Sequence, residues 1–125
     1  MLLNESIELN SFFDLVYVQN FGVSFGLLSG YVSHWLLIFV GTLIVFFIFY
    51  LMLISKHKIE KVAYFIILIG ALANITDRAI NSYVVDFILL HYKNFYWPAF
   101  NLADIYITIG IIMLIMSILF KSKEN

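Results

Sequence analysis

The stretch WLLIFVGTLIVFFIFYLMLI, residues 35–54, decides the fold class because its 20 residues carry no charge. An α-helix of about 20 apolar residues crosses the hydrocarbon core of a bilayer. Residues 62–80 and 102–120 form two further apolar runs of similar length. A helix against a soluble core has a polar stripe along one side, and these runs have none. The sequence therefore predicts three transmembrane helices.

The whole composition agrees with a small membrane protein. The chain has 125 residues, of which 63% are hydrophobic and 12% charged. This length allows one domain, residues 1–125. The absence of cysteine excludes thiol catalysis, disulfides and thiolate metal sites. Nothing in the sequence indicates nucleic-acid binding, because the few basic residues have a sufficient role as topology signals.

The lysines predict how the chain is oriented. Five of the six gather between the first two spans and after the third, at positions 56, 58, 61, 121 and 123, and Lys93 is the exception. Cytoplasmic loops carry an excess of Lys and Arg, so residues 55–61 form a cytoplasmic loop and residues 121–125 a cytoplasmic tail. Residues 1–34 and 81–101 then lie on the outer, periplasmic side.

This topology leaves the start of the sequence without an obvious way across the membrane. The first ten residues, MLLNESIELN, lack the basic region and the apolar stretch of a signal peptide. The simplest explanation is that a preceding helix is missing from this sequence. Translocation of the N-terminal tail without a leader is the alternative.

The two outer segments predict short strands resting on the membrane surface. Residues 7–10 and 14–20 contain β-branched and aromatic residues in partial alternation, and Asn20-Phe21-Gly22 is typical of a turn. Residues 83–88 are strand-like, and Pro98 predicts a break before the third span. The expected fold class is a mainly α membrane protein, with three transmembrane helices and a small periplasmic β-sheet against the membrane surface.

Three acidic residues lie where acids are energetically expensive, between or at the ends of apolar runs. They are Asp77, Asp86 and Asp104. Ionisable residues near hydrocarbon are rare and mark functional sites by default. Asp77 follows Asn74 by three residues, and Asp104 follows Asn101 by three, so each pair is expected to share one helical face. The hairpin between the second and third spans can bring the three acids together.

Two carboxylates in one partly dry site could hydrolyse a peptide bond. One ionised acid takes a proton from water and one protonated acid polarises the carbonyl, because close acids do not both ionise cheaply. A third acid beside Arg78 would be a neutralised structural partner. An Asp at a helix start is often only a cap, so the residues alone leave the catalytic and structural interpretations even. The histidines at positions 34, 57 and 91 form no cluster that predicts a metal site.

Four short motifs carry a resemblance to a known family. They are NFG at 20–22, NITDR at 74–78, VVDF at 84–87 and FNLAD at 100–104. With them the chain resembles bacterial lipoprotein signal peptidase (signal peptidase II), a membrane aspartic endopeptidase, from about Ile7 to Phe120. The family motifs are NxG, NxxDR, VVDF and FNxAD, in the same order, and Phe25 stands where the family keeps an aromatic residue.

The resemblance implies a site and an activity. Asp86 and Asp104 would form the catalytic dyad, with Asp77 and Arg78 as supporting residues. The residues that would orient the substrate or the dyad are Asn20, Gly22, Asn74 and Asn101. The implied substrate is a prolipoprotein whose cysteine carries a diacylglyceryl group, and cleavage falls before that cysteine. We further expect no metal or cofactor, contact with membrane lipid, and a monomer in the bacterial inner membrane with its active site near the outer face.

The sequence also departs from the family pattern. The family has a first membrane helix with a DxxSK-type motif, which this sequence lacks, and Ile69 and Ala73 replace two family glycines. A rival interpretation is therefore a non-catalytic membrane subunit or an inactive truncated relative. A proton relay is a weaker third interpretation, because the acids gather at one membrane face and form no chain across the bilayer.

Overall fold

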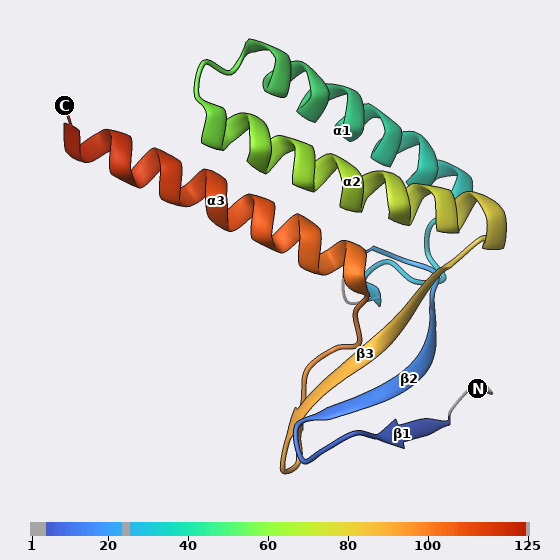
Figure 1. Cartoon of the computed structure of the whole chain (residues 1–125). Coiled ribbons are helices and arrows are strands. Elements are labelled where there is room, and N and C mark those ends of the chain that lie inside the picture. The colour runs from blue at the N-terminus through green and yellow to red at the C-terminus, as the bar shows by residue number, and fades with distance from the viewer. Residues whose placement is uncertain (1–4, 24–25, 125) are drawn as a thin grey trace. The chain divides into compact units, whose positions relative to one another are not determined.

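The structure is a computed structural model that describes residues 5–23 and 26–124, with side chains described as far as Lys121 (Figure 1). Phe25 and the side chain of Lys123 lie outside the described residues. The chain forms two compact units. We call residues 1–38 with 76–101 the sheet unit, and residues 39–75 with 102–125 the helical unit.

Among the described residues, three helices are long and apolar enough to cross a membrane, which confirms the predicted fold class. They are α1 (His34–Ile54), α2 (Lys58–Asn81) and α3 (Leu102–Glu124). The apolar part of α3 ends at Lys121, and the mean hydropathy of the three candidate spans is 2.9, 1.6 and 2.3. Most large apolar side chains on these helices are exposed, as expected for residues that face lipid.

Helix α2 begins four residues before the predicted span at 62, because the helix includes a polar first turn. Lys58, Glu60 and Lys61 occupy this turn. Glu and Lys are good helix formers, but a search for apolar runs excludes them. The helical backbone therefore extends beyond the apolar part of its sequence.

Small residues bring α2 close to both of its neighbours in the helical unit, where α2 lies between α1 and α3 (Figure 1). A Cβ at Gly41 of α1 would lie 3.3 Å from the side chain of Ile75. A Cβ at Gly70 would lie 2.6 Å from the Ala103 carbonyl oxygen, and one at Gly110 would lie 2.7 Å from that of Ala63. Close approach through small residues is the main packing device of helices in lipid.

The sheet unit contains a four-stranded antiparallel sheet in the order β1-β2-β3-β4 (Figure 1). The strands are β1 (Ser6–Glu8), β2 (Phe13–Asn20), β3 (Val84–Tyr92) and β4 (Phe95–Tyr96). β3 runs four residues beyond the predicted end at 88, because Leu89 and Leu90 pair with the start of β2 and the last two residues, 91 and 92, pair with β4. Cross-strand partners share a face, so Asn20, opposite Val84, lies on the same face as Asp86, opposite Val18.

A left-handed residue joins α2 to β3. Ser82 has a φ of 68°, and its N–H donates to the Arg78 carbonyl oxygen at 2.8 Å. Helices commonly end with a residue in this left-handed conformation. The position favours glycine, because other residues meet steric strain at positive φ. The turn between Arg78 and β3 therefore holds a serine at an energetic cost.

We expect Ser82→Gly to raise the free energy of unfolding by about 0.5–1 kcal/mol, because glycine adopts positive φ without strain. Thermal unfolding in detergent, followed by tryptophan fluorescence, measures the change. Ser82→Ala is the matched control, since it removes the hydroxyl and keeps the strain. Equal stabilisation by both variants would show that the backbone conformation is not the cause.

Candidate functional site

Asp86 is the most deeply buried acid among the described residues, with 3% of its surface exposed. Its Oδ2 accepts a hydrogen bond from Asn20 Nδ2 at 3.0 Å, and its Oδ1 accepts one from Asn101 Nδ2 at 2.9 Å. Burying a carboxylate is costly unless its oxygens are hydrogen-bonded. Here each oxygen receives an amide N–H, so the carboxylate is held in one orientation.

Asn20 has a second role as the residue that shapes the turn after β2. Its Oδ1 accepts the Gly22 N–H at 2.8 Å, and its Nδ2 also donates to the Val23 carbonyl oxygen at 2.9 Å. Asparagine side chains stabilise turns by bonding the backbone two residues on. The predicted turn at 20–22 therefore exists, and the same side chain forms the turn and holds Asp86.

Gly22 is required by close approach of the backbone. A Cβ at this position would lie 1.9 Å from the Leu27 carbonyl oxygen and 2.7 Å from the Ser29 nitrogen. The loop folds back here, with the Val23 N–H donating to the Leu27 carbonyl oxygen at 2.8 Å. Any side chain at position 22 would force this loop outward.

Arg78 is a buried cation of the sheet unit, with 8% exposure. Its terminal nitrogen donates to the Gly22 carbonyl oxygen at 2.6 Å, and the charges of Asp86 and Asp77 both act on its guanidinium. A buried charge is tolerated when an opposite charge compensates it. Arg78 therefore ties the end of α2 to the turn that holds Asp86.

Asp77 is occupied by the junction between α2 and β3. Its Oδ2 accepts the Val85 N–H at 2.9 Å, and its Oδ1 accepts a bond from Asn81 Nδ2 at 2.6 Å. Both oxygens are thus used to fix the start of β3, one residue before Asp86. The supporting role expected for Asp77 stays a prediction.

Asn101 reaches Asp86 because the chain before α3 runs beside β3. The Phe100 carbonyl oxygen accepts the N–H groups of Phe87 and Ile88, each at 2.9 Å, and the Phe100 N–H donates to the Ile88 carbonyl oxygen at 3.0 Å. Asn101 precedes α3, which begins at Leu102. The bridge between Phe100 and Ile88 holds the chain beside β3 up to this point, and the shared helical face expected for Asn101 and Asp104 stays a prediction.

Asn74 and Asp104 belong to the helical unit. Asp104 lies in the first turn of α3, is partly exposed, and its main-chain oxygen accepts a bond from Thr108 Oγ1 at 2.7 Å. Gly70 faces Ala103 and Ile107, and Asn74 lies about one helical turn further along α2. Measured along the helix axes, Asn74 and Asp104 therefore lie within about one turn, roughly 5 Å, of each other. The expected grouping of Asp104 with Asp77 and Asp86 stays a prediction.

Two polar pairs in the sheet unit were not anticipated from the sequence. The hydroxyls of Tyr17 and Tyr83 lie 3.3 Å apart, and this hydrogen bond, together with burial, raises the pKa of Tyr83. His91 Nε2 lies 3.1 Å from Asp14 Oδ1. Both pairs join β2 to β3 or to the residue before it, and only the strand register could have revealed them.

Comparison with known proteins shows the family of the chain. The family model for signal peptidase (SPase) II matches residues 1–120. The chain belongs to the signal peptidase II family. This is a family of bacterial membrane proteases, which confirms the resemblance drawn from the four motifs and the membrane location.

Individual relatives give the extent of the match. The chain is 43% identical over 111 residues to a lipoprotein signal peptidase of Rickettsia felis, covering 87% of this chain and 56% of that protein. It is 39% identical over 126 residues to one of Francisella tularensis subsp. novicida, covering 97% of this chain and 78% of that protein. The chain thus spans little more than half the length of the Rickettsia relative.

Solved structures confirm the fold. A bacterial membrane enzyme solved by the in meso method at 2.3 Å resolution matches all of this chain and 77% of its own, with a TM-score of 0.90 and 28% identity. A second such enzyme, solved at 1.9 Å resolution, matches 95% of this chain with a TM-score of 0.80 and 30% identity. The three helices and the small sheet are therefore an architecture already found in bacterial membrane enzymes.

We expect Gly22→Ala to lower the free energy of unfolding by about 2–3 kcal/mol, because the added methyl group overlaps the Leu27 carbonyl oxygen. The displaced turn would also weaken the bonds of Asn20 and Arg78. Gly30→Ala is the control, since Gly30 has a φ of 79° but open space around it, so that variant should lose only about 1 kcal/mol of backbone strain. Equal losses in fluorescence-detected unfolding would contradict the close-approach argument.

Proposed function

We propose that this chain removes signal peptides from prolipoproteins whose cysteine carries a diacylglyceryl group, and that it cuts the bond before that cysteine. Membership of the signal peptidase II family supports the reaction class. The relatives from Rickettsia and Francisella are named lipoprotein signal peptidases. The lipid group on the substrate fits a protein with three candidate membrane spans.

The observation that carries the mechanism is the carboxylate of Asp86, which is buried and held by the amides of Asn20 and Asn101. We propose that Asp86 and Asp104 form a catalytic dyad. Asn101, which donates to Asp86, precedes Asp104 by three residues in the sequence. The same two amides keep Asp86 from rotating away from a reacting water.

In the proposed reaction one carboxylate is ionised and the other protonated. Asp86 is assigned the ionised role, because two amide donors and the Arg78 charge stabilise its negative form. Asp86 takes a proton from water, the water oxygen attacks the scissile carbonyl carbon, and the protonated Asp104 donates a hydrogen bond to the developing oxyanion. The tetrahedral intermediate then collapses and releases the amine of the lipidated cysteine. This amine receives the proton that Asp86 took from water.

The remaining site residues are assigned supporting roles. Asp77 fixes the start of β3 through the Val85 N–H. Arg78 fixes the turn through the Gly22 carbonyl oxygen and compensates the charge of Asp86. Asn74, near the depth of Asp104, is assigned to orient that acid or the substrate backbone.

We expect Asp86→Asn and Asp104→Asn each to lower cleavage by at least about a hundredfold, because each removes one partner in proton transfer. The measurement is a gel-shift assay on a diacylglyceryl-modified prolipoprotein, with the purified chain in lipid. Asp14→Asn is the control, because Asp14 pairs with His91 on the sheet and takes no part in the proposed reaction.

The outcomes separate the proposals. Near-normal cleavage by either variant, when it is inserted and folded, would remove that residue from the dyad. Absence of cleavage by the unaltered chain, with correct insertion, would instead favour a non-catalytic membrane subunit or an inactive relative.

A shared proton also predicts how activity depends on pH. The dyad works with one acid ionised and one protonated, so kcat/KM should fall on both the acidic and the alkaline side of an optimum. Initial cleavage rates at subsaturating substrate, measured across a series of buffers, test this. A flat profile would contradict the shared-proton mechanism.

A further inference from the structure

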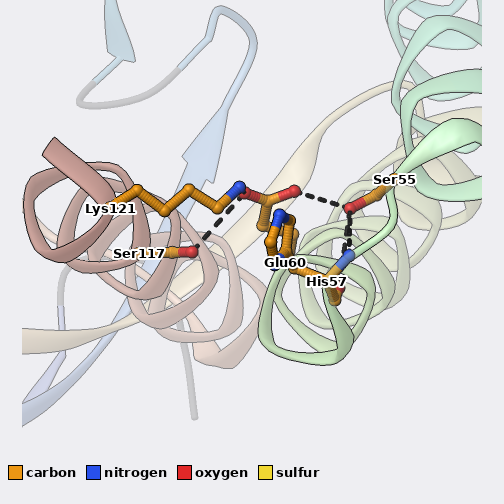
Figure 2. A network of polar contacts seen from close by, with 5 residues as sticks. All are labelled: Ser55, His57, Glu60, Ser117 and Lys121. Carbon is orange, nitrogen blue, oxygen red and sulfur yellow. Dashed lines mark hydrogen bonds and ion pairs between the residues drawn. The ribbon is translucent and has the colours of Figure 1, made fainter. Parts of the chain in front are cut away.

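A polar cluster lies in the helical unit at the opposite end of α3 from Asp104, and the proposed reaction does not use it (Figure 2). Glu60, in the first turn of α2, pairs with Lys121, in the last turn of the apolar part of α3. Ser55 donates to Glu60 Oε2 at 2.6 Å, and Ser117 donates to Glu60 Oε1 at 3.5 Å. We call these four residues the Glu60 cluster.

The Glu60 cluster joins all three helices of the helical unit at one end. Ser55 directly follows α1, Glu60 lies in α2, and Ser117 and Lys121 lie in α3. Figure 2 shows the Glu60 carboxylate between Ser55 on one side and Lys121 with Ser117 on the other. The charges also suit their helix ends, because an acid is stabilised near a helix N-terminus and a cation near a C-terminus.

The contacts of the Glu60 cluster and the close contacts at the glycines give the same antiparallel register of α3 against α2. Glu60 meets Ser117, and Gly70 meets Ile107. From Glu60 to Gly70 is 10 residues along α2, and from Ser117 back to Ile107 is also 10 along α3. The polar contact and the small-residue contact therefore support the same axial position of α3 against α2.

Axial position matters because two apolar helices in lipid lack a hydrophobic force that draws them together. Packing at Gly70 and Gly110 opposes sliding, and a charge pair at a fixed height adds a directional constraint. α3 has no proline and runs 17 residues from Asp104 to Lys121, about 26 Å of rigid helix. A displacement of α3 at Lys121 is therefore transmitted to Asp104.

We propose that Glu60 and Lys121 are positioning residues, which set the depth of Asp104 in the membrane from the far end of α3. The proposal extends the proposed function, and only its kinetic part rests on that function. A slip of α3 by one helical turn would move Asp104 by about 5.4 Å. Even a shift of about 1 Å at a reacting group can cost about a hundredfold in rate.

The test measures helix register and catalysis in the same variants. The chain has no cysteine, so cysteines placed at the exposed positions Ile69 and Ile115 take spin labels selectively, one on α2 and one on α3. Pulsed electron paramagnetic resonance in lipid then gives the distribution of distances between the two helices. Cleavage of the lipidated prolipoprotein gives kcat and KM.

We expect Glu60→Gln and Lys121→Met to broaden the distance distribution and to lower kcat about tenfold, with KM within about twofold of the unaltered chain. Lys121→Arg should retain both properties because it keeps the ion pair. Lys61→Met is the matched control, since it removes a lysine from the exposed side of the same turn as Glu60. It should change neither the distances nor kcat.

Two results would overturn the proposal. One is an unchanged distance distribution in both Glu60→Gln and Lys121→Met. The other is a loss of kcat in Lys61→Met as large as in those variants, which would assign the effect to surface charge. If the unaltered chain cleaves nothing, the proposed function fails, and the distance distributions still decide whether the Glu60 cluster sets the register.

Discussion

The burial of one carboxylate is the constraint on which the sheet unit depends. Asp86 is nearly inaccessible to solvent, and a buried charge requires hydrogen-bond donors and an opposite charge nearby. Asn20 and Asn101 supply the donors from two sides, and Arg78 supplies the charge. Each donor is in turn fixed by backbone contacts, so the turn after β2 and the bridge at Phe100 form part of the same arrangement.

The helical unit meets a different constraint, because its surroundings are apolar. Its helices pack through Gly41, Gly70 and Gly110, where any side chain would collide with the neighbouring helix or be in tight contact with it. Such packing opposes sliding of one helix along the next. The polar contacts at the far end of α3 add a second constraint in the same register, since Glu60 meets Ser117 and Gly70 meets Ile107.

Composition predicted the three helices because each apolar run matches the thickness of a bilayer. The small sheet was predicted from the partial alternation of β-branched and aromatic residues in the outer segments. Local pattern could not predict where β3 ends, since its second half is defined by pairing with β2 and, at its last two residues, with β4. The same limit applies to the chain before α3. The bridge between Phe100 and Ile88 brings Asn101 beside β3, and such a pairing cannot be read from local pattern.

The candidate site shows the same division between local and distant information. Motifs identified Asn20, Arg78, Asp86 and Asn101, all of which the structure connects within the sheet unit. The different contacts of the two acids Asp77 and Asp86 were visible only in the structure. Asp77 gives both oxygens to the junction between α2 and β3, whereas each oxygen of Asp86 receives a side-chain amide from elsewhere in the chain. The bonds of Asp77 fix one local junction, whereas those of Asp86 come from two separate segments, the turn after β2 and the residue before α3. This difference supports the proposal that Asp86 takes part in acid–base chemistry and that Asp77 has a structural role.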